Sequence, residues 1–266
     1  LNGGINQAIM DLVGKKRINA ISCMSIFTDN KKSASQLAKA VHKNGNAQIG
    51  LHLTLSEYTP LTEMPDFAPN GFPSIKTILV KSHLRRLNRK ELENEITAQI
   101  DSFHELFGFA PDFIDGHQHV HVLPVIRKMI LETAVGRLAP GGWVRSCHQA
   151  ISSSIKTGTA LSRTLLISRL SSQLQKHLIA NDIDTNHHFW GINEFDPISD
   201  YRGLFLKWLA AAAKTQGPVV FMCHPGQVDY GIDLPEDPIA LHRPNEYTYF
   251  SSPEFLEDLS AHGFEL

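Results

Sequence analysis

The sequence predicts an α/β fold with parallel strands, and two observations support this. Apolar runs typical of strands alternate along the 266 residues with segments whose apolar positions recur at helical spacing. Such alternation favours parallel strands joined by helical crossovers. Hydrophobic residues make up 42% of the chain and charged residues 20%, which suffices for one full core. We therefore expect residues 1–266 to form a single domain.

The elements are expected in an order that alternates almost throughout. They are a helix over residues 4–13, a strand over 19–26, a helix over 35–43, a strand over 48–53, a helix from 88 to 107, a strand entering at 113, a helix over 123–135, a short strand over 143–145, a helix over 201–214, a strand over 218–223 and a last helix from 252.

Local signals set several boundaries. Gly45 can close the second helix as a left-handed residue. Asn88 can cap the third helix while Glu91, three residues on, completes a capping box, and the apolar stripe then runs to Gly108. Pro253 suits the first position of the last helix.

Two stretches fit neither pattern. Residues 59–74 are rich in Pro, Asp and Gly and are expected to form a long loop that shapes substrate binding at the mouth of the fold. Residues 146–159 are polar, and we expect a mobile segment there.

Composition argues against several partners. The formal net charge is −2, so we expect no nucleic acid partner, and the basic cluster 81–90 is interpreted as a solvated face. No apolar run is long enough to span a membrane, and no signal peptide is evident. The three cysteines, Cys23, Cys147 and Cys223, cannot all pair and lack zinc-ligand spacing. These features favour a soluble protein in a reduced cytoplasmic setting.

Histidines follow three of the predicted strands. Residues 115–121 read Asp-Gly-His-Gln-His-Val-His, and His52 and His224 each follow another apolar run. The carboxyl ends of parallel strands converge on one site, so these imidazoles are expected to meet around a divalent metal. The alternative is that the histidines simply cap strands through hydrogen bonds.

Four stretches together resemble the YdjC-like carbohydrate deacetylases, the family of chitooligosaccharide deacetylase and hopanoid-biosynthesis-associated proteins. They are Leu1-Asn-Gly-Gly-Ile-Asn-Gln-Ala-Ile9, Gly50-Leu-His-Leu-Thr54, the segment 115–121 and Met222-Cys-His-Pro-Gly226. The resemblance spans nearly the whole chain. It implies an irregular TIM-like (β/α) barrel of glycoside hydrolase/deacetylase type. The implied activity is metal-dependent removal of N-acetyl groups from an acetamido sugar or chitooligosaccharide, with Mg²⁺ or Zn²⁺ as the metal.

The resemblance also implies a ligand set. His52 and His117 match two metal ligands, and the third is an aspartate in an Ala-Asp-Asp-Phe-Gly strand that the family carries ahead of the position of Leu1. The other aspartate of that stretch is the implied general base. We expect the natural protein to carry this first strand.

The remaining residues of the histidine segments have less certain roles. His224 is the candidate proton donor to the leaving amine, or else merely bonds a neighbouring carbonyl. His119 and His121 are expected to orient ligands or touch the sugar, because on an extended strand three imidazoles cannot all reach one ion. If a helix starts early, His117 and His121 could both bind metal. Asp115 is expected to support the ligands, with a third-ligand role as its rival.

Three further residues complete the expected site. Arg145 is a candidate to stabilise an oxyanion or to fix a carboxylate, with a salt bridge at the barrel rim as the alternative. Phe189 and Trp190 could form an apolar platform for a pyranose ring, or be ordinary core.

Two other functions stay open. One is a different metal-dependent hydrolysis, by an amidohydrolase or a phosphoesterase, and the latter should show several Lys or Arg side chains around the histidines. The other is a metal-binding or sugar-binding protein without turnover. The sequence leaves a homodimer open.

Overall fold

The computed structural model describes residues 3–45, 47–150, 160–227 and 237–266. It confirms an α/β fold with parallel strands. Four strands form one sheet in the order β1 (Ala20–Cys23), β2 (Gln48–Leu53), β3 (Phe113–Gly116) and β4 (Trp143–Val144). A second parallel pair joins β5 (His188–Trp190) to β6 (Val219–Phe221).

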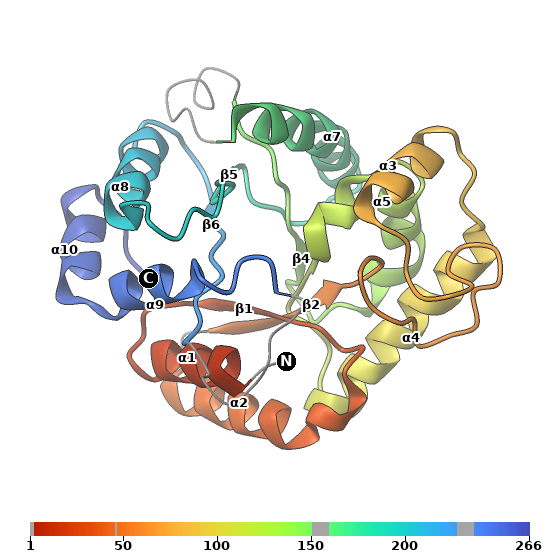
Figure 1. The fold of residues 1–266 in the computed structure, drawn as a ribbon, viewed down its shortest axis with the longest axis horizontal. Coiled ribbons are helices and arrows are strands. Elements are labelled where there is room, and N and C mark those ends of the chain that lie inside the picture. The colour runs from red at the N-terminus through yellow and green to blue at the C-terminus, as the bar shows by residue number, and fades with distance from the viewer. Residues whose placement is uncertain (1–2, 46, 151–159, 228–236) are drawn as a thin grey trace.

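Helices surround these strands, as in a (β/α) barrel (Figure 1). They are α1 (Gly3–Gly14), α2 (Lys31–Asn44), α3 (Ile75–His83), α4 (Arg89–Phe107), α5 (Ile126–Met129), α7 (Leu161–Ala180), α8 (Tyr201–Ala212), α9 (Arg243–Ser251) and α10 (Pro253–Ala261), with short 3₁₀ turns η1 (Thr28–Asn30), η2 (His117–Val122) and η4 (Val135–Arg137) and a π-helical turn η3 (Ile130–Ala134). None of the described helices is long and apolar enough to cross a membrane.

The central strands are buried, and their register sets the site. Leu51 and Leu53 of β2 and Ile114 of β3 are at most 1% exposed. The parallel ladder pairs Leu51 with Ile114 and His52 with Asp115. Because side chains alternate along a strand, the leucines on either side of His52 enter the core while His52 and Asp115 share the other face.

The start of α4 follows the expected capping in part. The Asn88 side chain accepts hydrogen bonds from the backbone amides of Lys90 and Glu91, and Gly108 ends the helix in the left-handed region with φ 80°. The expected capping box does not form. The Glu91 carboxylate instead accepts from the amides of Asp66 and Phe67, at 3.0 and 2.9 Å, and so anchors the long loop 59–74.

Some expectations need correction. The helix expected over residues 123–135 is α5 continued by a π-helical turn. The extended strand expected through the three histidines ends at Gly116, because Gln118 and His119 adopt left-handed φ values of 48° and 60° within η2. Part of the segment expected to be mobile, 151–159, lies outside the described residues.

A cavity of about 1570 Å³ opens at the carboxyl ends of the strands and extends between β1 and β6, both of which line it. Within the described residues, β1 pairs only with β2, and β6 only with β5. The two sheets therefore do not close into a continuous barrel in the part of the chain that is described. The long loop 59–74 contributes nothing to the described wall of this cavity.

Candidate functional site

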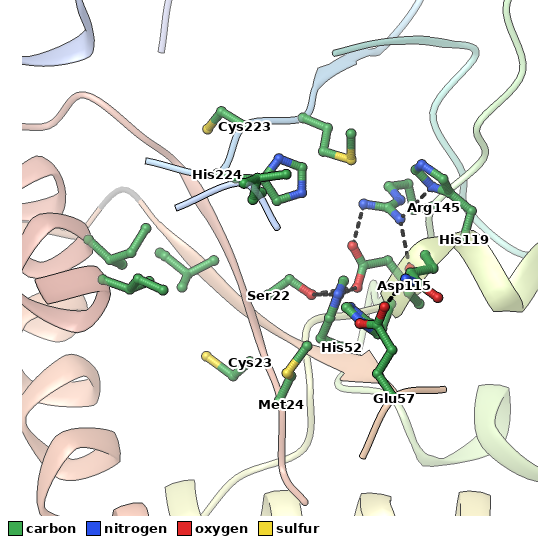
Figure 2. Close-up of a pocket in the computed structure, with 18 of the residues that line it drawn as sticks. Ser22, Cys23, Met24, His52, Glu57, Asp115, His119, Arg145, Cys223 and His224 are labelled. Atoms are coloured by element: carbon green, nitrogen blue, oxygen red, sulfur yellow. Dashed lines mark hydrogen bonds and ion pairs between the residues drawn. The ribbon is translucent and has the colours of Figure 1, made fainter. Parts of the chain in front are cut away.

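Asp115, the penultimate residue of β3, is the centre of the site. It is 2% exposed. Its Oδ1 lies 2.6 Å from His52 Nδ1 and also accepts a hydrogen bond from Ser22, while its Oδ2 lies 2.5 Å from Arg145 Nη1. Burial opposes ionisation, but the Arg145 guanidinium and His52 outweigh it and hold the pKa of Asp115 well below its usual range. Both carboxylate oxygens are thus committed to side chains, and Asp115 supports other groups (Figure 2).

His52 is oriented by this carboxylate. Since an ionised carboxylate only accepts hydrogen bonds, Nδ1 of His52 carries the proton and donates it to Asp115. The other ring nitrogen, Nε2, takes no part in this contact, and His52 lines the cavity. A ring held by a carboxylate on one nitrogen and free on the other is the usual arrangement of a metal-binding histidine.

His117 is held in the same manner by a residue that the sequence patterns missed. Its Nε2 lies 2.8 Å from the Glu57 carboxylate, which also accepts from the Gln118 side chain at 2.5 Å. Its ring centroid lies 5.6 Å from that of His52. Burial, followed by the charge of His52, lowers the pKa of His117. The two candidate ligands are therefore neighbours on the same wall of the cavity.

Three residues beside the two candidate ligands have left-handed backbone. Glu57, Gln118 and His119 all have positive φ, at 70°, 48° and 60°. Left-handed backbone costs a side-chain-bearing residue on the order of 1 kcal/mol or more, and such residues gather at functional sites. Here the left-handed turn carries His117 and His119 to different positions on the cavity wall instead of continuing the strand.

Arg145, just after β4, connects Asp115 to the next histidine. Its guanidinium donates to the Gly116 carbonyl and to His119 Nδ1, both at 3.3 Å, in addition to the Asp115 ion pair. Because arginine can only donate, His119 Nδ1 accepts, and the proton of a neutral His119 is on Nε2. Arg145 is 5% exposed. It fixes a carboxylate of the protein in a salt bridge, and that salt bridge is buried instead of lying at the rim.

His121 lies behind the cavity wall. It is fully buried, donates from Nε2 to the Arg145 carbonyl at 3.0 Å, and contacts the Cys147 thiol at 3.7 Å. Burial and the nearby guanidinium lower its pKa to about 3. His119 lines the cavity and lies 3.4 Å from the same thiol, and burial followed by Arg145 sets its pKa well below the usual value.

His224 approaches the cavity from the opposite side, three residues after β6 (Figure 2). Burial lowers its pKa to about 3, and the charges of Arg243, His52, Arg145 and His117 add to the effect. Those charges act on His224 because all these groups face one space. Its Nδ1 is buried without a hydrogen-bond partner among the described residues, so His224 is neutral near pH 7.

Phe189 and Trp190 do not form the expected platform. Phe189 is 0% exposed and Trp190 is 1% exposed, and neither belongs to the described lining of the cavity. The face of Phe189 lies 5.3 Å below the Arg145 guanidinium carbon. A ring with no accessible face cannot stack on a sugar, so both residues are core, the alternative that the sequence left open.

The described residues fit a metal ion in part. His52 and His117 each have one nitrogen fixed by a carboxylate and the other available. No group of three or more His, Cys, Asp or Glu donors suited to a metal is found among the described residues. Catalytic metal sites use three protein ligands as a rule. The two imidazoles would therefore need at least one further donor.

Comparison with known proteins identifies the family. The family model described as YdjC-like protein matches residues 1–261, so the chain belongs to the YdjC-like family. A carbohydrate deacetylase of Vibrio parahaemolyticus is 26% identical over 99% of this chain and 87% of its own length. A chitooligosaccharide deacetylase of Citrobacter koseri is 29% identical over 86% of this chain and 79% of its own.

Two other matches differ in extent. A carbohydrate deacetylase of Danio rerio is 35% identical, but the match spans 48% of this chain and only 41% of that relative. A crystal structure from Enterococcus faecalis, named for a proposed cleavage of cellobiose-phosphate, superposes with a TM-score of 0.69 over 100% of this chain and 92% of that one, at 22% identity. That likeness shows the fold.

Proposed function

We propose that this chain is a metal-dependent N-deacetylase acting on an acetamido sugar or a chitooligosaccharide. The names of its relatives in the YdjC-like family support a carbohydrate substrate and an amide bond. The observation that carries the proposal is the convergence on one cavity of His52, His117 and His224 from three separate strand ends, around the buried Asp115–Arg145 pair. A cytoplasmic location remains part of the proposal.

His52 and His117 would hold the divalent ion, Mg²⁺ or Zn²⁺. When bound, such an ion polarises the acetamide carbonyl and lowers the pKa of water. Asp115 and Glu57 orient the two imidazoles, and Arg145 keeps Asp115 ionised. The protein's own contribution is thus a pair of rings whose orientation is fixed before any ligand arrives.

For the third donor and the general base, the proposal relies on the Asp-Asp strand that the family resemblance implies. A strand leading into α1 would lie next to β1, because a right-handed crossover places consecutive parallel strands side by side. The cavity extends along that edge of β1 towards β6. Carboxylates at the end of such a strand would reach the same mouth as His52 and His117.

His224 is the proposed proton donor to the leaving amine. Because the imidazole is neutral, it must gain a proton before it can donate one. The proton that the general base takes from the attacking water is the available source, and it has to pass from that carboxyl group to His224 before the amine leaves. Its buried ring, with Nδ1 unpartnered within the described residues, can accept and return a proton without first breaking a hydrogen bond. The expected assistance is on the order of 10²–10⁴-fold in rate.

The test is acetate release. Full-length protein would be stripped with chelator, reloaded with Mg²⁺ or Zn²⁺, and incubated with N-acetylated mono- and disaccharides. We expect release only after reloading, and its loss in His117→Ala. His83→Ala is the matched control, because His83 is an exposed residue of α3 that bonds the Leu79 carbonyl and does not line the described cavity. Metal content measured on the same variants separates lost binding from lost catalysis.

The same experiment decides between this proposal and its alternatives. Metal uptake with no acetate release from any sugar would favour a binding protein. Release of phosphate from sugar phosphates would favour a phosphoesterase. Two of the cations on the cavity wall already have carboxylate partners, Arg145 with Asp115 and Arg243 with Asp237. The cavity wall therefore suits the binding of a phosphate less well than that of an amide.

A further inference from the structure

The peptide of His224 is held by side chains of α9. The last ladder bond of β6 is donated by the Met222 amide to the Trp190 carbonyl, at 2.8 Å. Beyond it, the His224 amide donates to Glu246 Oε2 at 2.5 Å, and the His224 carbonyl accepts from Arg243 Nη1 at 3.0 Å. Both backbone groups of this residue are thus fixed by residues about twenty positions later in the chain.

These side chains belong to a buried and interconnected network. Glu246 and His242 are each 1% exposed, and His242 Nε2 lies 3.1 Å from Glu246 Oε1. His242 Nδ1 donates to the Asp196 carbonyl at 3.1 Å. Arg243 in turn donates to Asp237 at 2.6 Å. Each oxygen of Glu246 therefore has a partner, one in the site peptide and one in His242.

Stability alone is a poor reason for such a network. A buried ion pair often stabilises a protein no more than well-packed apolar residues would. Burying the Glu246 carboxylate is costly, and among the described residues it has two hydrogen-bond partners. One of those partners is the amide of a residue that faces the cavity. The arrangement is explained if the position of His224 matters for what the site does.

The His224 ring is not oriented by a hydrogen bond at Nδ1 in the part of the chain that is described. The ring meets the edge of Phe195 with centroids 5.4 Å apart and planes at 77°. Since no hydrogen bond orients the imidazole at Nδ1, its direction depends on where the main chain is fixed.

We propose that Glu246 and Arg243 are positioning residues that aim the His224 imidazole at the leaving group by clamping its backbone from both sides. The inference rests on the proposed deacetylase function. It assigns to α9 a role in proton delivery that is separate from holding the fold together.

The main test uses two substrates that differ in their need for a proton. Release of an amine from an N-acetyl sugar requires protonation of the leaving group, whereas p-nitrophenolate leaves from p-nitrophenyl acetate without it. We expect Glu246→Ala to lower kcat on the N-acetyl sugar about 100-fold with KM within about 3-fold. On the ester, the loss should be below about 3-fold. The comparison uses only the part of the ester activity that is lost in His117→Ala, because that part depends on the proposed site.

Rescue and control variants sharpen the test. Glu246→Gln keeps an acceptor for the His224 amide, and it should recover the N-acetyl activity to within about 10-fold of wild type. Arg243→Lys, which loses the planar fork, should show a weaker form of the same substrate selectivity. The control is Asp258→Asn, another buried carboxylate, which bonds Arg202 and Tyr249 and does not line the cavity. It should affect both substrates equally.

Equal losses on both substrates in Glu246→Ala, or no loss on either, would overturn the proposal. A readout independent of turnover covers the case in which the proposed function itself fails and wild type releases no acetate. Histidine ring resonances, with that of His224 assigned by His224→Asn, should shift in Glu246→Ala and Arg243→Lys but not in Asp258→Asn. An unmoved His224 signal in both positioning variants would refute the clamp whatever the reaction is.

Discussion

The Asp115–Arg145 pair allows a sharp prediction, because it is almost completely enclosed. The two side chains are 3% and 6% exposed, with 2.5 Å between Oδ2 and Nη1. In Asp115→Asn the guanidinium loses its carboxylate partner. The Gly116 carbonyl and His119, both at 3.3 Å, remain as acceptors, and its Nε has no hydrogen-bond partner in the described residues. A cation would be left uncompensated in the core.

The expected cost follows from that stranded charge. Removing one partner of a buried ion pair destabilises a protein by about 3–5 kcal/mol. For a chain of this size each kcal/mol shifts Tm by roughly 2–4 °C, so we expect Tm to fall by between about 6 and 20 °C. Urea unfolding with chelator present measures the change in free energy of unfolding without any contribution from bound metal.

A double variant separates the stranded charge from general damage. Asp115→Asn with Arg145→Met removes both charges and keeps apolar contact with the ring of Phe189, over which Arg145 lies. It should regain about 2 kcal/mol or more over the single variant. Asp101→Asn, in an exposed pair with Arg137, should cost less than about 1 kcal/mol. A single variant within 1 kcal/mol of wild type, or a double variant no more stable than the single one, would refute the reasoning.

Three further predictions concern the surroundings of the site. Burial lowers the pKa of His121 to about 3 from 6.5, so the fold requires the neutral ring. Its contribution to stability is complete above pH 6.5 and falls by about 1.4 kcal/mol per pH unit on acidification towards pH 3. We expect His121→Gln to reduce this dependence of stability on pH, measured as the urea midpoint at each pH. An unchanged pH dependence would contradict the assignment. Phe189→Ala should cost about 3–5 kcal/mol of stability with little change in KM, whereas a large rise in KM in a stable variant would revive the sugar platform. Glu95 is fully buried and accepts from the amides of Leu61 and Thr62; Glu95→Ala should speed amide hydrogen exchange in the loop 59–74 and leave kcat unchanged, because that loop does not line the described cavity.

Much of the site could be predicted because its residues follow strands that apolar runs identify. His52 is the fifth residue of β2 and Asp115 the third of β3, and parallel register makes them neighbours. The rule that the carboxyl ends of parallel strands converge on one site then needs no long-range information beyond the order of the strands. His224 follows β6 by the same logic. The distances between the rings, in contrast, depend on turns that the rule does not describe.

The partners that orient these residues were not predictable in the same way. Glu57 is 60 positions from His117, and Ser22 is 93 positions from Asp115. No spacing rule connects residues so far apart. The left-handed backbone at Glu57 and Gln118 is also invisible in the sequence, because neither is the glycine or asparagine that would signal it. The only local signal for Glu57 was its place a few residues beyond the end of β2.

Helix α7 was not among the predicted elements, although its sequence carries an apolar stripe. Ile167, Leu170, Leu174 and Leu178 recur at helical spacing and pack against the core. The other buried positions are Thr164, Ser168 and Ser171. The hydroxyls are buried because they bond a peptide segment: Ser171 accepts from the Cys147 amide at 2.7 Å, and Ser168 bonds both backbone groups of Gln149. That segment carries the thiol that contacts His119 and His121. The polar residues of the buried face therefore hold the wall behind the histidines in place, a role that the apolar pattern does not reveal.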